Sequence, residues 1–177
     1  MDEDINSARL MMLEYEHIKQ EQRLRIGIRD NLLYASLASM VAVIATSAAA
    51  NDRAFLLSLP PVSVILGWTY LVNDEKISAI GRYVRTDLGP RLTALTDEGV
   101  PPFGWETAHR SDPRRVTRKY GQLTVDLLTF CLLPAIALCA FWLSVADAPL
   151  LVLVSLVELG ALLALGVQII LYADLQR

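Results

Sequence analysis

The chain has 177 residues, of which 54% are hydrophobic, and its mean hydropathy is positive. A soluble domain of this length rarely needs so many apolar residues, so the excess is expected to face lipid. The 19 acidic and 16 basic residues give a formal net charge of -3, and most of them lie in residues 1–30 and 73–121. The bulk charge therefore averages polar segments with nearly uncharged ones, and only the local charge is informative.

Residues 1–31 contain no proline and a single glycine, Gly27. Three acidic residues at positions 2–4 favour the N-terminus of a helix. We expect this helix to run directly into the first apolar run. Charged residues interrupt its apolar positions, which predicts packing against partners rather than a clean two-stranded coiled coil. Because the chain opens with acids and the first apolar run begins only after residue 30, a signal peptide is not expected.

Four long apolar runs follow, at residues 32–50, 54–72, 123–145 and 150–172. A run of about 18 or more apolar residues can cross a hydrocarbon core about 30 Å thick. Short polar turns join the first run to the second and the third to the fourth, which predicts two antiparallel hairpins. The alternative, a soluble four-helix bundle, would show a polar face at every third or fourth residue, and these runs do not. The sequence predicts an all-α integral membrane protein with four transmembrane helices.

The expected organisation has five parts: a cytoplasmic N-terminal helix (1–31), a first transmembrane hairpin (32–72), a cytoplasmic helical middle segment (73–121), a second transmembrane hairpin (122–173) and a cytoplasmic tail (174–177). Lys and Arg are concentrated in the N-terminal and middle segments, and the two short turns hold only Arg53. Positive charge favours the cytoplasmic side, so both termini are predicted to be cytoplasmic. Aromatic residues near the ends of the runs, such as Trp68 and Trp142, agree with these boundaries.

No catalytic machinery is recognisable in the sequence. Cys131 and Cys139 are too far apart on one expected helix to form a disulfide, and we expect them to be packing residues. His17 and His109 have no companion at metal-ligand spacing. Phosphate-binding glycine loops, nucleophile elbows and metalloprotease motifs are absent. We therefore expect no enzymatic activity, no metal site and no cofactor.

The middle segment is expected to be helical at both ends. Apolar residues at helical spacing predict an amphipathic helix over residues 77–88 that stops at the Gly-Pro pair 89–90. A glycine- and proline-rich stretch at 99–106 predicts an ordered loop. Ser-Asp-Pro at 111–113 predicts an N-cap and a first-turn proline for a helix that enters the third run.

Residues 72–85, VNDEKISAIGRYVR, followed by Gly-Trp-Glu at 104–106, resemble a widespread family of small bacterial four-span membrane proteins. In layout the chain is most similar to the Hailong-type channel effectors, which are membrane proteins of anti-phage systems paired with nucleotidyltransferases. The resemblance implies a gated homotetramer in the bacterial inner membrane. It also implies control at the cytoplasmic side by a DNA oligomer, or by a nucleotide second messenger made by a partner nucleotidyltransferase.

Candidate pore-lining residues are the polar side chains of the fourth run, Ser155, Glu158 and Gln168. A charge inside the membrane costs roughly 2.5 kcal/mol or more, so Glu158 is expected to face protein or water. A ring of such carboxylates would favour cations, whereas a protonated or hydrogen-bonded packing carboxyl would not, and both interpretations stay open. Asp126, one turn inside the third run, is expected to pair with nearby bases or reach the interface rather than line a pore.

Candidate ligand-binding residues are the bases of the middle segment: Arg82, Arg85, Arg114, Arg115, Arg118 and Lys119. Such bases commonly set topology and attract anionic lipid, at about 1 kcal/mol each. A phosphate-rich ligand would use the same chemistry if oligomerisation gathered several copies around one axis. Pro60 and Pro61 predict a kink in the second run. Small residues four apart, such as Ala38 with Ala42 and Gly160 with Ala164, predict close helix contacts within or between subunits.

These observations predict an oligomeric membrane effector, a ligand-gated channel in anti-phage defence. The alternative is a non-conducting membrane anchor or assembly partner for a soluble protein. A small proton-coupled transporter that uses Glu158 is disfavoured, because it would have less need for the long middle segment.

Overall fold

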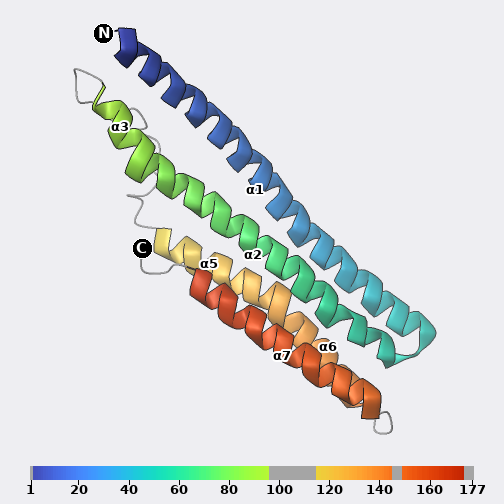
Figure 1. Cartoon of the computed structure of the whole chain (residues 1–177). Coiled ribbons are helices and arrows are strands. Elements are labelled where there is room, and N and C mark those ends of the chain that lie inside the picture. Colours follow the sequence, from blue (N-terminus) through green and yellow to red (C-terminus); the bar gives the residue numbers. More distant parts are fainter. Residues whose placement is uncertain (1, 96–114, 145–148, 174–177) are drawn as a thin grey trace. The chain divides into compact units, whose positions relative to one another are not determined.

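The structure, a computed structural model, describes residues 2–95, 115–144 and 149–173 (Figure 1). These residues are helical apart from short turns, and no strand occurs among them, so the all-α expectation is confirmed. The elements are α1 (Asp2–Ala50), the 3-10 helix η1 (Arg53–Ser58), α2 (Leu59–Tyr83), the π-helix η2 (Val84–Leu88), α3 (Gly89–Thr93), α5 (Arg115–Leu127), the π-helix η3 (Leu128–Leu132), α6 (Leu133–Trp142) and α7 (Pro149–Tyr172).

Four helical stretches are long and apolar enough to cross a membrane. They are Ile5–Ala50, Arg53–Thr93, Thr117–Trp142 and Pro149–Tyr172. Three of them contain a predicted apolar run in full, and the remaining one, the third in chain order, ends at Trp142, before the predicted run end at residue 145. The helix ends at Ala50 and Tyr172 coincide with predicted run ends. The chain is therefore compatible with a multi-pass membrane protein by length and composition.

The expected continuous helix from the N-terminal segment into the first run is confirmed, because α1 is unbroken from Asp2 to Ala50. The helix ends where Asn51 adopts a φ of 51°, a left-handed conformation that asparagine tolerates better than most residues. Asp52 then caps η1, because its side chain accepts a 2.8 Å hydrogen bond from the backbone N–H of Ala54. The hydroxyl of Ser47 donates to the backbone oxygen of Asp52 at 2.9 Å and holds the turn against α1.

Pro60 and Pro61 lie in the first turn of α2, directly after the 3-10 helix η1. The helix changes from 3-10 to α at the place where a kink was predicted, and the kink itself stays a prediction. The first-turn N–H groups of a helix have no intrahelical partner, so two prolines remove no α-helical hydrogen bond there.

Two π-turns stand directly before prolines. In η2 the N–H of Gly89 donates to the oxygen of Val84, and Pro90 follows; in η3 the N–H of Leu133 donates to the oxygen of Leu128, and Pro134 follows. A proline ring clashes with the carbonyl four residues earlier in a regular α-helix, and the wider turn relieves this clash. The prediction that the middle helix stops at residues 89–90 is therefore wrong, since α3 continues to Thr93.

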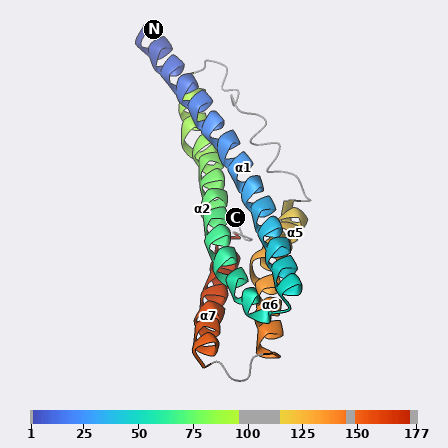
Figure 2. The same ribbon diagram turned by 90° about the vertical axis from the view of Figure 1, so that its right-hand side faces the viewer.

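Contacts divide the chain into two compact units. Unit 1 consists of Met1–Ile28 and Asn73–Arg115, and unit 2 consists of Arg29–Val72 and Val116–Arg177. Unit 1 thus takes its described helices from the first half of α1, the end of α2, η2 and α3. Unit 2 takes the second half of α1, η1, most of α2, and the helices from α5 to α7, of which α6 and α7 pack side by side (Figure 2).

The core of unit 2 is built from three apolar clusters. The largest surrounds Tyr70 and Phe130, whose ring centroids are 5.1 Å apart, and includes Leu165 and Ile169 of α7. The others centre on Met40 with Ala137 and on Leu138 with Phe141 and Leu162. All four long helical stretches contribute side chains to the largest cluster, since Leu32 and Leu33 of α1 pack against it. Unit 2 is therefore a packed helical bundle in its own right.

Candidate functional site

Glu158 lies on α7, at the edge of the face that packs into unit 2. It shares this face with Ser155 and Leu162, which are buried. Its carboxyl is half-buried, and its Oε2 is enclosed without a hydrogen-bond partner among the described residues. A buried carboxylate oxygen that no protein group satisfies carries a substantial desolvation cost. Glu158 is therefore the polar group on α7 that most needs a partner from outside the described residues.

Ser155 is fully buried and is already hydrogen bonded. Its hydroxyl accepts a 2.7 Å bond from Nε1 of Trp142 in α6 and donates to the backbone oxygen of Val152 at 2.7 Å. Ser155 has no exposed surface within this chain, and its pore-lining role stays a prediction. Ser155 links α6 to α7 within unit 2, and it satisfies the indole donor of Trp142.

Gln168 is half-buried on α7, about three turns beyond Glu158. The helical periodicity puts Glu158, Ala161 and Gln168 on one stripe, since their spacing is three and seven residues. Of the three candidate pore-lining residues, Glu158 and Gln168 therefore share a half-buried stripe, whereas Ser155 is buried within the bundle.

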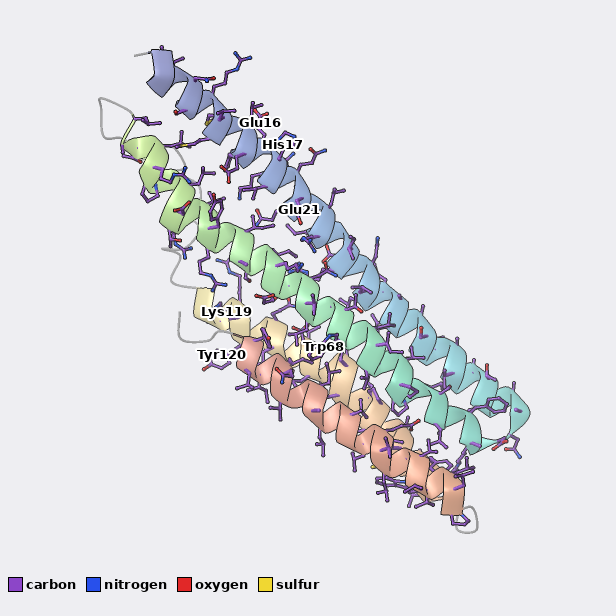
Figure 3. The ribbon with its side chains drawn as sticks, viewed as in Figure 1. Glu16, His17, Glu21, Trp68, Lys119 and Tyr120 are labelled. Atoms are coloured by element: carbon purple, nitrogen blue, oxygen red, sulfur yellow. The ribbon has the colours of Figure 1, made fainter. Side chains whose placement is uncertain are left out.

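Asp126 belongs to a buried polar network that joins α5 to α2. Nε2 of Gln122 donates to Oδ1 of Asp126 at 2.9 Å and also to the hydroxyl of Tyr70 in α2. Asp126 is buried, as expected of a paired carboxylate, and a neutral amide is one of its partners. Sequence reasoning missed Gln122, and Tyr70 is one of the aromatic residues near the ends of the apolar runs that were expected to lie at a membrane boundary. Tyr70 is buried in the core, whereas Tyr34, Trp68 and Tyr120 are at least half-exposed. Trp68 and Tyr120 are labelled in Figure 3.

In unit 1, polar side chains bridge α1 and α2 in an antiparallel order. Nη1 of Arg25 donates to Oδ1 of Asn73 at 3.3 Å, and Nε2 of Gln22 donates to the oxygen of Ile77 at 3.1 Å. Farther along, the hydroxyl of Tyr83 donates to Glu14. No local sequence pattern predicts these pairs, because each joins residues about 50 to 70 positions apart. Polar residues on the facing sides of the two helices indicate that such contacts can form, but they do not indicate which residues pair.

The hydrogen bond to Glu14 has an electrostatic consequence for Tyr83. That bond, partial burial and the negative charges of Glu14 and Asp87 raise the pKa of Tyr83 from 10.0 to about 12, while Arg91 acts in the opposite direction. Arg91 itself pairs with Asp87 at 3.2 Å. The phenol is therefore a hydrogen-bond donor over the whole physiological pH range.

The six candidate ligand-binding bases are distributed over both units. Arg82 is exposed at the end of α2 and Arg85 is half-buried in η2, both in unit 1. Arg118 and Lys119 lie in α5 of unit 2, where Lys119 is near the start of the helix (Figure 3). Arg115 begins α5, but its side chain is outside the described part, and Arg114 lies outside the described residues altogether. The predicted loop at 99–106 and cap at 111–113 also lie outside them.

The small residues behave in two different ways. Ala38, Ala42, Gly160 and Ala164 are all exposed, so these pairs make no close contact inside the described chain. The close helix contact occurs instead at Gly67, where an added Cβ would lie 2.8 Å from Leu165 Cδ2 and 3.0 Å from Phe130 Cδ1. Ser63 and Gly67 are buried small residues four apart in α2, a pair that sequence reasoning missed among the others of this kind.

Potential metal ligands and the two cysteines are the remaining reactive groups of the described part of the chain. No group of three or more His, Cys, Asp and Glu side chains suited to a metal ion occurs among the residues searched. Both cysteines are free; Cys131 packs against the largest cluster, as expected, whereas Cys139 is exposed. Comparison of the sequence with protein-family models and curated proteins, and of the fold with solved structures, finds no match.

Proposed function

We propose that the chain is an integral protein of a bacterial inner membrane, inserted as two helical hairpins with both termini and unit 1 in the cytoplasm. Its four long apolar helices support this proposal. So does the exposure of large aliphatic side chains in unit 2, among them Val41, Ile65 and Val157, each about two-thirds exposed. An apolar surface of this extent is suited to lipid or to another protein rather than to water.

We further propose that copies of the chain assemble, as a tetramer by the resemblance, around an ion pathway lined in part by α7. The observation that supports this proposal best is the half-buried carboxyl of Glu158, an acidic group inside an apolar span. In lipid, the exposed part of such a carboxyl needs water or a polar group from a neighbouring copy. Either source fits a polar stripe of Glu158 and Gln168 that faces other subunits or an aqueous path. A ring of Glu158 carboxylates would favour cations.

Control by a nucleotide or a DNA oligomer is the third part of the proposal, and anti-phage defence is the role that it serves. Exposed Arg82 and half-buried Arg85 in unit 1 supply cationic groups for phosphate. The resemblance of the chain's layout to the Hailong-type effectors adds the expectation that the ligand comes from a partner nucleotidyltransferase.

Current measurements in planar bilayers test the channel. Glu158→Gln keeps the shape of the side chain and removes its charge, so the oligomer should persist while the cation preference falls in asymmetric salt. Glu75→Gln is the matched control, because Glu75 is an exposed acid outside the predicted spans. Equal reversal potentials for the wild type and Glu158→Gln would rule out a selectivity role. In that case Glu158→Leu should alter oligomer stability instead, as expected of a hydrogen-bonded packing carboxyl.

A second function, a non-conducting membrane anchor for a soluble protein, is favoured by one observation. Leu10, Leu13 and Leu24 of α1 lie in unit 1 and are 44% to 64% exposed. Exposed leucines on a helix outside the membrane are suited to a protein partner. An inserted, assembled protein that carries no current with or without nucleotides and DNA oligomers would favour the anchor over the channel.

A further inference from the structure

An apolar groove opens on the side of unit 2, between the end of α1, the start of α2 and α6. It has a volume of about 290 Å³ and is lined by Met40, Ile44, Leu56, Leu59, Leu133, Ile136, Ala137 and Ala140. All eight side chains are apolar. The volume is close to the lower limit of about 300 Å³ for small-molecule sites. The groove thus offers an aliphatic ligand space without a hydrogen-bonding group from its lining side chains.

The floor and the rim of this groove differ in burial. Met40, Leu59 and Ala137 form part of a buried cluster and make the floor. Ile44, Leu133 and Ile136 are 44% to 55% exposed and make the rim. The groove exists because α6 presents alanines at 137 and 140, where larger side chains would fill the space.

A positive charge lies at one end of the groove. Nη1 of the exposed Arg53 lies 3.5 Å from the backbone oxygen of Ala140, a lining residue. The neighbouring Asp52 is the nearest acid in sequence, and its carboxylate accepts the N–H of Ala54. An aliphatic groove with a guanidinium at its end complements one chemical class of ligand, an acyl chain joined to an anionic phosphate.

We propose that this groove binds one acyl chain of an anionic glycerophospholipid, whose phosphate lies against Arg53. The inference rests on the proposed insertion in a membrane, where Arg53 lies in the outer turn. It adds a specific lipid site to that proposal, because lipid that merely surrounds the bundle would have no preference for this groove or for its headgroup charge.

Native mass spectrometry of the purified full chain tests the site. The probe is a mixture of phosphatidylglycerol and phosphatidylethanolamine added to protein in mild detergent. The wild type should retain phosphatidylglycerol in preference. Arg53→Gln should weaken its retention about fivefold, the contribution of one base near an anionic headgroup. Arg9→Gln is the matched control, since Arg9 is an exposed base of α1 in unit 1.

Filling the groove should remove both lipids. Ala140→Leu places a larger side chain in the groove, and Ala48→Leu makes the same change at an exposed position of α1 outside the lining. Equal lipid retention by the wild type and Ala140→Leu would overturn the proposal, as would wild-type protein that retains no lipid. If Ala140→Leu fails to fold, the comparison of Arg53→Gln with Arg9→Gln still decides the headgroup contact.

A photoreactive side chain at Ile136 identifies the occupant directly. A lipid adduct supports the proposal, and a protein dimer adduct would instead assign the groove to a second copy. Cell fractionation separates this inference from the one on which it rests. A chain found in the soluble fraction refutes membrane insertion, whereas a chain in the membrane fraction without specific lipid retention refutes only the lipid site.

Discussion

The hydroxyl of Tyr83 at the end of α2 donates a 2.6 Å hydrogen bond to Oε1 of Glu14 in α1. This bond lies farthest from the turn of the three that bridge the helices of unit 1. Tyr83→Phe keeps the ring and removes the donor, so it should destabilise unit 1 by about 1 kcal/mol, the contribution of a partly exposed hydrogen bond. Hydrogen exchange of the amides in residues 77–93 measures the change.

The control for this variant is Thr86→Val, which also removes a hydroxyl. The Thr86 hydroxyl donates to the backbone oxygen of Arg82 in the same helical stretch, so no contact with α1 is lost. Equal exchange rates in the two variants would mean that the bond to Glu14 does not hold α1 against α2.

The raised pKa of Tyr83 predicts how unit 1 responds to alkali. Because the pKa is about 12 in the folded chain and 10.0 without these interactions, the stabilisation is fully present below pH 10.0. It is lost as the pH rises from 10.0 toward 12. An ultraviolet difference titration of wild type against Tyr83→Phe should therefore isolate a phenol with a midpoint near 12, and a midpoint near 10.0 would contradict the contact.

Gly67→Ala should destabilise unit 2. The added methyl would overlap Leu165 and Phe130, and overpacking of this kind commonly costs about 1 to 3 kcal/mol. Gly160→Ala is the matched control, because an added Cβ there meets nothing within 4 Å. Thermal unfolding in detergent should put the midpoint of Gly67→Ala below that of Gly160→Ala, and the reverse order would exclude close packing at Gly67.

The basic residues of unit 1 predict a salt-dependent ligand. Changing Arg82 and Arg85 to Gln together should weaken the binding of a DNA oligomer and lower the slope of log affinity against log salt. Arg9→Gln with Arg23→Gln removes two exposed bases from α1 instead and should leave the slope unchanged. Unchanged affinity in the Arg82 and Arg85 double variant would leave these bases with a topological role.

Topology can be measured by cysteine labelling in a background that lacks Cys131 and Cys139. Ala50→Cys and Ser144→Cys lie at the ends of α1 and α6 and should react with an impermeant thiol reagent in intact cells. Ser78→Cys, exposed in unit 1, should react only after the membrane is permeabilised. The opposite pattern would reverse the orientation derived from Lys and Arg.

The positions of the long helices could be predicted because the signal is local. A stretch of apolar residues without charge is visible in the sequence whatever it packs against, and the ends at Ala50 and Tyr172 followed from it. The helix geometry at the prolines could not be predicted, since a Gly-Pro pair can end a helix or follow a π-turn. Here the pair follows the π-turn η2, and the chain stays helical through α3. Whether the helix ends or continues at the Gly-Pro pair depends on whether the packing of buried residues such as Leu88 and Leu92 keeps the chain helical.

The sequence predicts which residues are candidates for the site, but it does not predict how those residues are arranged. Glu158 is recognisable in the sequence as an acidic residue within an apolar run. Only the packing of α6 on α7 distinguishes it from Ser155, whose hydroxyl accepts a hydrogen bond from Trp142. Likewise, Gln122 is an ordinary polar residue in the sequence. It gains a role because α5 places it between Tyr70 and Asp126, and no local pattern records that relationship.

The π-turns η2 and η3 each hold one residue more than an α-helical path would need, directly before Pro90 and Pro134. A deletion of one residue in an ordinary helix turns every later side chain by about 100°, since 3.6 residues make a full turn. Within a π-turn, the same deletion can be absorbed by a return to regular α-helix, at the cost of restoring the clash between the proline ring and the carbonyl four residues earlier. These two places are therefore where the length of the chain can change by one residue while the helices on either side keep the faces they present to their neighbours.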